Sequence, residues 1–219
     1  GFYFMQNTQN TLLKRTFFSD LILSKTIAQR IAYIAVMTAF SVVTNMFLEF
    51  RMFDIQFSIT IVVSALSGIL LGPLCGFAAC WIGDLVGYLY NSWGLLYMPW
   101  VGLSTGVIAL LSGLIFNGIH FKFRGSVYVK LFFVCLISFF VCTVGINSTG
   151  FYLYNKTMGF STKVIEFVDK KFGTGVTYWG YVIYRLFGGQ IWNCLLNYAL
   201  LFAVVPLLNS IKPLRLDIR

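Results

Sequence analysis

The chain has 219 residues, of which 58% are hydrophobic and 11% are charged, and it carries a net charge of +9. About a quarter of the residues in an ordinary soluble domain are charged, so 16 basic and 7 acidic residues are too few for a water-facing shell. The composition excludes a soluble globular fold and predicts an all-α membrane protein with lipid as its main surroundings, because helices satisfy their own backbone hydrogen bonds inside the bilayer.

The first segment, residues 1–26, is interpreted as a tail or an amphipathic element. Met5 lies inside it, so we interpret residues 1–4 as a tag remnant. Residues 12–24 combine Lys14 and Arg15 with Leu and Phe, a pattern typical of a short helix on an anionic membrane surface. The alternative is a frayed tail.

Six apolar stretches follow and predict a compact bundle of six transmembrane helices over residues 27–208, with a C-terminal tail at 209–219. The stretches are residues 27–48, 55–71, 74–90, 97–116, 127–144 and 178–208. Breakers rich in Gly, Pro and Asn separate them. The longest polar connection, residues 145–177, contains the helical-looking KVIEFVDKKF and is expected to form a lid or gate.

The basic residues predict the orientation of this bundle. With six spans, the side that holds both termini carries ten Lys or Arg residues, and the opposite side carries five. Cytoplasmic loops of membrane proteins are enriched in Lys and Arg, so we expect both termini in the cytoplasm and the connections 49–54, 91–96 and 145–177 outside. Because the basic residues flank apolar runs, a nucleic-acid surface is excluded.

The motifs also limit the chemistry of the chain. Its five cysteines lie in apolar runs without a CxxC pair, and His120 is the sole histidine, so no metal site is expected. No Walker A pattern occurs, and we predict neither ATPase activity nor a bound cofactor. An intramembrane enzyme would need an acid–base pair, but Asp84 and His120 are expected near opposite ends of the membrane.

The first apolar stretch carries small residues on one face. Ala35 and Ala39 form an AxxxA pattern, and Ala32 lies one turn earlier. This spacing lets two helix backbones approach closely in a membrane. It predicts a partner-binding face at Ala32, Ala35 and Ala39, with ordinary internal packing as the alternative.

A lone carboxylate, Asp84, lies in the third stretch between Gly83 and Gly87. A charge in lipid is costly unless it is paired or faces water. We interpret Asp84 as structural, shielded by close helix contacts at the glycines, with a lining role in a ligand cavity as the alternative.

The last stretch carries a polar stripe. Arg185 is followed by Gln190, Asn193 and Asn197, which are spaced by three or four residues as on one face of a helix. Neutral amides inside a membrane helix predict either contact with a polar solute or an interhelical hydrogen-bond seam.

Aromatic residues gather at the outer ends of the third, fourth and sixth stretches. An interfacial aromatic belt explains part of this pattern, but the polar residues nearby favour a site for a flat organic ligand. The predicted ligand-binding residues are Asn91, Trp93, Tyr97, Trp100, Asn147, Tyr178, Trp179, Arg185, Gln190 and Asn193.

These features resemble the substrate-binding (S) components of energy-coupling-factor (ECF) vitamin transporters over residues 27–208. The resemblance rests on the six stretches, the AxxxA face, and the runs SGILLGPLCGFAACWIGDLVGYLY and MPWVGLSTGVIALLSGLIF. It is nearest to the folate-type S components, whose final helix is similar to YRLFGGQIWNCLLNY. Folate-type members typically have an FPGFT-like sequence where this chain has Met98–Gly102, and the connection before the last stretch is longer here.

The resemblance implies a multi-pass protein of the bacterial cytoplasmic membrane that captures a vitamin from outside. It implies partnership with a transmembrane coupling subunit, contacted through the AxxxA face, and with two cytoplasmic ATPases that bind the ATP. A wide, aromatic mouth leads us to expect cobalamin as the ligand, with folate or pantothenate as alternatives. A membrane scaffold or channel subunit is the further alternative.

Overall fold

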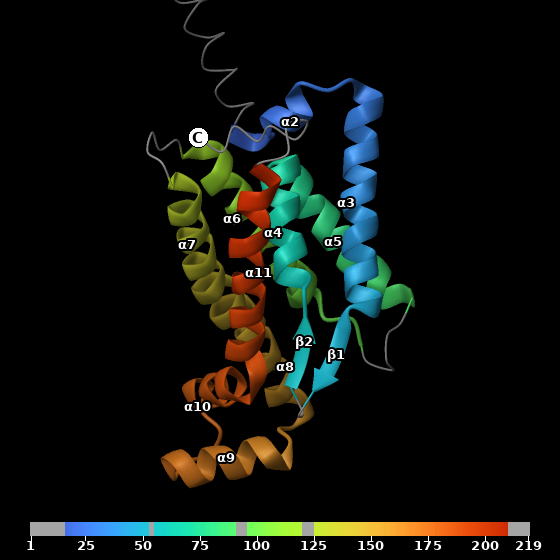
Figure 1. Cartoon of the computed structure of the whole chain (residues 1–219). Coiled ribbons are helices and arrows are strands. Elements are labelled where there is room, and N and C mark those ends of the chain that lie inside the picture. Colours follow the sequence, from blue (N-terminus) through green and yellow to red (C-terminus); the bar gives the residue numbers. More distant parts are fainter. Residues whose placement is uncertain (1–15, 53–54, 91–95, 120–124, 210–219) are drawn as a thin grey trace, which may run out of the picture.

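The computed structural model describes residues 16–52, 55–90, 96–119 and 125–209 of the chain. A bundle of helices stands between the short helix α2 (Asp20–Leu23) at one end and the crossing helix α9 (Thr162–Phe172) at the other (Figure 1). We call these the α2 end and the α9 end.

Five helical spans are long and apolar enough to cross a membrane. They are α3 (Ile27–Phe47), α5 (Pro73–Tyr90), α6 (Pro99–Gly118), the continuous helix of α7 (Ser126–Ile137), η1 (Ser138–Ser148) and α8 (Thr149–Met158), and the helix of α10 (Tyr178–Arg185), η2 (Leu186–Gln190) and α11 (Ile191–Asn209). The sixth, α4 (Thr60–Leu71), is apolar but has only 12 residues. Each predicted stretch therefore contains one helix, which confirms the six-helix bundle. The cytoplasmic position of the termini stays a prediction.

The short helix α4 forms the centre of the bundle. Every residue from Ile61 to Ile69 is buried, and α4 packs against α5 and α6. The contact with α6 is close because Gly68 has no side chain: a Cβ there would collide with the backbone carbonyl of Ala109. A helix covered in this way needs no apolar length matched to lipid, which accounts for its shortness.

One predicted boundary is wrong near the second stretch. Strand β1 (Glu49–Met52) pairs antiparallel with β2 (Ile55–Ser58), and α4 begins only at Thr60. Residues 49–52 of the predicted connection 49–54 therefore form a strand, and residues 53–54 lie outside the described residues. The alternation of apolar and polar residues in IQFSIT is the period of a strand, and it overrides the overall hydrophobicity of the run.

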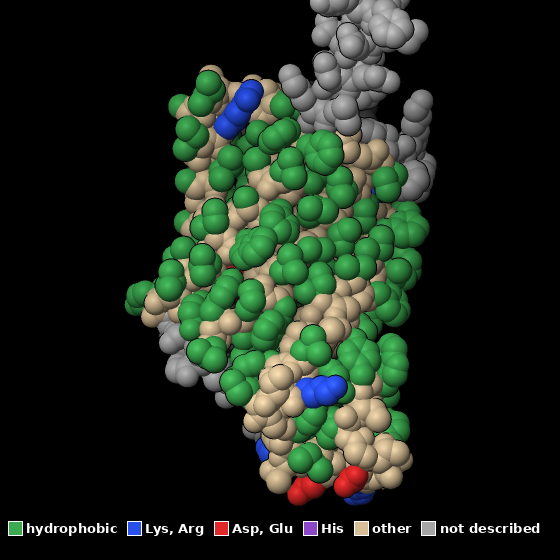
Figure 2. Space-filling view, turned by 180° about the vertical axis from the view of Figure 1, so that it is seen from behind, with side chains coloured by type: hydrophobic (Ala, Val, Ile, Leu, Met, Phe, Trp, Pro, Cys, Tyr) green, Lys and Arg blue, Asp and Glu red, His purple; other side chains and the backbone are tan. Residues whose placement is uncertain are grey.

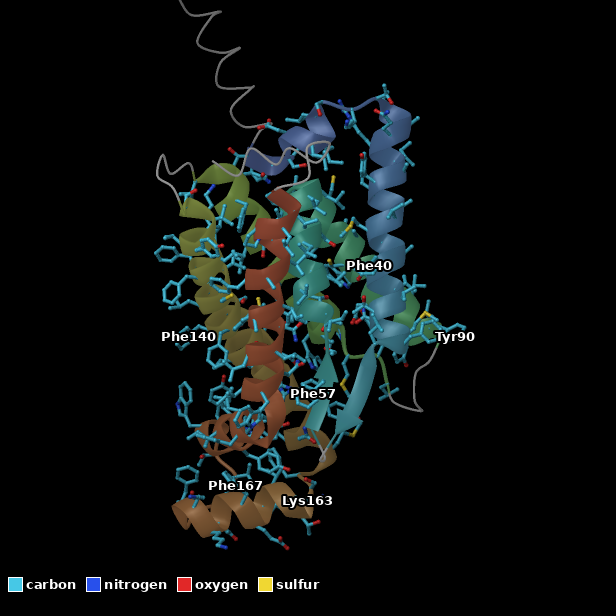
Figure 3. All side chains as sticks on the ribbon, viewed as in Figure 1. Phe40, Phe57, Tyr90, Phe140, Lys163 and Phe167 are labelled. Carbon is cyan, nitrogen blue, oxygen red and sulfur yellow. The ribbon has the colours of Figure 1, made fainter. Side chains whose placement is uncertain are left out.

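The predicted connection 145–177 is mostly helical. The fifth helix continues through the π-helical segment η1 and through α8, and α9 confirms the helical pattern of KVIEFVDKKF. Val164 and Val168 of α9 are buried against Tyr181 of α10. Phe167 points from α9 toward α10 and meets Tyr184 at a ring-centroid distance of 5.4 Å (Figure 3). We call α8, α9 and α10 together the cap.

The surface is what a membrane protein requires. Apolar side chains cover the middle of the face in Figure 2, and the described charged side chains visible there lie mainly toward the two ends. Phe140, for example, projects away from the fifth helix and is 61% exposed (Figure 3). Exposed rings at mid-height would be unfavourable in water and are favourable in lipid.

The helix α2 packs against the bundle. Leu21 and Ile22 are buried, and the Ser19 hydroxyl donates a hydrogen bond to the carbonyl of Leu70 at the end of α4. Asp20 and Ser24 stay exposed. Residues 19–22, in the segment before α3, are thus packed against the bundle through one apolar side.

Candidate functional site

Trp100 lies in the first turn of α6, near the α9 end of the bundle. Its indole packs flat on the backbone of α8, since a Cβ added to Gly150 would lie 2.5 Å from Cδ1 and 2.6 Å from Cδ2 of the ring. The same ring meets Phe151 edge-on at a centroid distance of 5.9 Å, and Tyr154 lies at 6.1 Å. The start of α6 and the cap therefore meet at Trp100.

Arg185 reaches the same place from the end of α10. Its Cζ atom lies 4.2 Å from the centroid of the Phe151 ring, a cation–π distance. Its Nη1 donates a hydrogen bond of 3.1 Å to the carbonyl oxygen of Asn147 in η1. Among the residues that the structure describes, Arg185 makes no ion pair, so its remaining N–H groups can bind a ligand.

Two buried polar atoms in this cluster lack hydrogen-bond partners within the described chain. They are the Nε1 donor of Trp100 and the Oδ1 acceptor of Asn147. Most buried polar groups in folded proteins are satisfied, and leaving one unpaired costs about 1–3 kcal/mol. We call Trp100, Asn147, Phe151 and Arg185 the aromatic–arginine cluster. It offers one donor, one acceptor, a cation and two aromatic rings.

Tyr97 lies three residues before Trp100, just before α6. Its hydroxyl donates a hydrogen bond of 3.3 Å to Oδ2 of Asp84 on α5, and its ring lies 5.0 Å from that of Tyr88. Burial, together with the neighbouring Asp84 carboxylate, raises the pKa of Tyr97. The lone carboxylate of the third stretch is thus engaged with the start of α6.

Tyr178 and Trp179 begin α10 and differ in their surroundings. The Tyr178 hydroxyl lies 2.9 Å from Oγ1 of Thr149, and its ring meets that of Tyr152 at 5.4 Å. Tyr178 therefore ties α10 to α8 within the cap. Trp179 is 65% exposed, as a residue of an interfacial belt would be.

The amides of the last helix form a hydrogen-bond seam with the start of α4. Oδ1 of Asn193 accepts from the Ser58 N–H at 3.0 Å, and Oδ1 of Asn197 accepts from the Val62 N–H at 3.2 Å. Nδ2 of Asn197 donates to the Ser58 carbonyl at 2.7 Å. Because α4 has no side-chain cap of its own, α11 satisfies its first backbone groups.

The predicted stripe is not one continuous face. Gly189 has φ 140° within the π-helical segment η2, so the α-helical register breaks between Arg185 and Asn193. Gln190 is partly exposed at the end of this segment. At Asn193 and Asn197 the observed contacts are those of the seam alternative, and ligand contact by Gln190 or Asn193 stays a prediction.

Three of the ten predicted ligand-binding residues, Trp100, Asn147 and Arg185, come together in the aromatic–arginine cluster. Asn91 and Trp93 lie outside the described residues. The sequence reasoning missed Gly150 and Phe151. Helical spacing from Asn147 would have placed both on its face, but that segment was interpreted as a loop.

The predicted partner face is open. Ala32, Ala35 and Ala39 of α3 are all exposed. The apolar window of α3 is only 11% buried, the lowest value among the five candidate spans. Internal packing within the described chain therefore does not occupy this face.

Comparison with protein families decides the class. A family model described as "ECF-type riboflavin transporter, S component" matches residues 25–178, from just before α3 to the first residue of α10. The chain belongs to this family. No curated protein matches the sequence.

The family match confirms the resemblance to an S component and places the protein among multi-pass membrane proteins. An S component is the vitamin-binding subunit of its transporter and not the ATPase. The matching family is the riboflavin type, and nothing in the match supports cobalamin. The matched residues include Trp100, Asn147 and the alanine face, while Arg185 lies beyond them.

Proposed function

We propose that this S component binds a flat heteroaromatic vitamin of the riboflavin kind at the aromatic–arginine cluster. The observation that carries the proposal is the pair of buried, unpartnered atoms, Trp100 Nε1 and Asn147 Oδ1, beside the guanidinium of Arg185. The family description supports the choice of vitamin.

The chemistry of a flavin ring matches these groups. Its imide edge presents carbonyl oxygens that accept from the Trp100 N–H and from Arg185, and a ring N–H that donates to Asn147 Oδ1. The flat ring system packs against indole and phenyl faces. A pterin has a similar lactam edge, so folate is the alternative. Pantothenate has no aromatic ring, and a corrinoid is too bulky to present a single flat edge.

The transport role follows from family membership. We propose that the α9 end faces the outside, so that the cap and Trp100 receive the vitamin there, and that the α2 end faces the cytoplasm. The exposed face of Ala32, Ala35 and Ala39 would then contact the membrane coupling subunit, to which two ATPases supply the energy.

The test is a binding titration of the purified full chain in detergent. Riboflavin, folate, pantothenate and cobalamin are added in turn, and quenching of flavin or protein fluorescence gives each dissociation constant. We expect riboflavin to bind most tightly. Trp100→Phe, which keeps a ring and removes the N–H, should weaken binding about tenfold, the value of one hydrogen bond.

Trp192→Phe is the matched control, because Trp192 is exposed on α11 and is not among the predicted ligand-binding residues, so it should leave affinity unchanged. Tighter binding of folate than of riboflavin would replace the flavin by a pterin. An unchanged dissociation constant in Trp100→Phe would remove the cluster from the binding site.

A further inference from the structure

Asp84 is a carboxylate in the middle of an apolar span. It is 8% exposed on α5, and no other residue of that helix carries a charge. Ionisable residues within transmembrane helices are rare and costly, and they are commonly tied to function. The described contacts of Asp84 show what it holds in place.

The carboxylate lies against the first turn of α6. A Cβ added to Gly102 would be 2.7 Å from Asp84 Oδ2 and 3.0 Å from the Tyr97 hydroxyl, so the glycine makes room for this pair. Helix α6 begins at Pro99 without a side-chain cap of its own. A negative charge beside a helix N-terminus is favourable. The first turn of α6 has no acidic residue of its own, and the Asp84 carboxylate on α5 provides the negative charge there.

The same turn carries Trp100. Tyr97, which donates to Asp84, is three residues before Trp100, and Gly102 is two residues after it. On the other side, the Trp100 ring lies on Gly150 and against Phe151 of α8. The first turn of α6 is therefore held between Asp84 on α5 and the cap.

We propose that Asp84 is a positioning residue of the vitamin site. Through Tyr97 it fixes the first turn of α6, and this sets the Trp100 ring and its N–H at the ligand. The inference rests on the proposed function for the ligand, but the placement of Trp100 can be measured without one.

The experiment uses the full chain labelled with 5-fluorotryptophan, with the Trp100 signal in the 19F spectrum assigned by Trp100→Phe. Tyr97→Phe removes the hydrogen bond while keeping the ring, and Asp84→Asn keeps an acceptor oxygen for the Tyr97 hydroxyl. We expect Tyr97→Phe to shift or broaden the Trp100 signal and to weaken riboflavin binding about tenfold. Because Asp84→Asn keeps the acceptor oxygen and loses only the charge, it should change the Trp100 signal and the affinity less than Tyr97→Phe does.

A double variant separates positioning from general structural damage. In the Trp100→Phe background, Tyr97→Phe should weaken binding less than about twofold further, because the group that it positions is gone. Tyr128→Phe is the matched control: it deletes a hydroxyl on the exposed side of α7 and should leave the signal and the affinity unchanged.

Two results would overturn the proposal: an unmoved Trp100 signal in Tyr97→Phe, or full additivity of Tyr97→Phe and Trp100→Phe in binding. If the unmodified chain fails to bind riboflavin while Tyr97→Phe still moves the Trp100 signal, the flavin assignment is wrong and the positioning of Trp100 by this pair is supported. Tyr97→Phe keeps the test valid even if variants of Asp84 fail to fold.

Discussion

Gly150→Ala tests the aromatic–arginine cluster directly, because one contact decides whether this substitution stabilises or destabilises the protein. In a helix without such a contact, replacing Gly by Ala stabilises by about 1 kcal/mol. Here the new Cβ would lie 2.5–2.6 Å from two atoms of the Trp100 ring. The ring must retreat by about 1 Å to reach an ordinary carbon contact of about 3.5 Å. Overpacking of this kind costs about 1–3 kcal/mol, so we expect net destabilisation.

Binding should fall as well, since the displaced indole carries the N–H that we assign to the vitamin. Loss of that hydrogen bond predicts a dissociation constant higher by about tenfold to a hundredfold. Thermal unfolding in detergent and riboflavin titration measure the two effects. Gly118→Ala, a helical glycine whose Cβ would make only an ordinary contact, is the control. A Gly150→Ala protein of raised stability and unchanged affinity would refute the described packing of Trp100.

Three further predictions address other parts of the molecule. Arg185→Lys should weaken riboflavin binding about tenfold with little change in unfolding temperature, because lysine keeps the charge but loses the planar stacking on Phe151. Asn197→Leu should lower stability by about 2–4 kcal/mol in denaturant unfolding, since it leaves backbone groups at the start of α4 unpaired. Replacing Ala35 and Ala39 by Leu should leave vitamin binding unchanged and reduce copurification with the coupling subunit; intact assembly would argue against the alanine face.

Hydrophobicity was sufficient to predict the six helices, because each span must satisfy its backbone internally in lipid. Hydrophobicity alone gave the wrong structure for two segments that are not simple apolar helices. Residues 55–58 belong to a largely apolar run, but apolar and polar side chains alternate within them. They form β2, which pairs with β1. Residues 149–158 are polar enough to suggest a loop, yet they form α8, whose aromatic residues pack against α9 and α10. Such packing between distant segments overrides local propensity and is not visible in composition.

The sequence was sufficient to predict which types of residue form the candidate site. It was not sufficient to predict which residues contact one another there. Asn147 and Arg185 stand out in the sequence because amide and guanidinium groups are unusual in a membrane span, and Trp100 stands out because many aromatic residues gather near them. Gly150 and Phe151 do not stand out. Gly150 matters because a ring from another helix lies on it, and Phe151 because Arg185 stacks on its face. Both roles arise because the fifth helix continues through η1 into α8, where these two residues meet Trp100 of α6 and Arg185 of α10.

The asparagines show what separates a structural amide from a ligand-binding one. Asn193 and Asn197 have the same side chain as Asn147, and all three lie in helices that are candidate membrane spans. Their amide oxygens accept backbone N–H groups from residues 135 positions away in the chain, so they are already satisfied. Asn147 Oδ1 is buried and has no partner among the described residues. Replacing a satisfied amide should therefore cost stability first, whereas replacing Asn147 should cost affinity first, and unfolding and binding measured on the same variants distinguish the two.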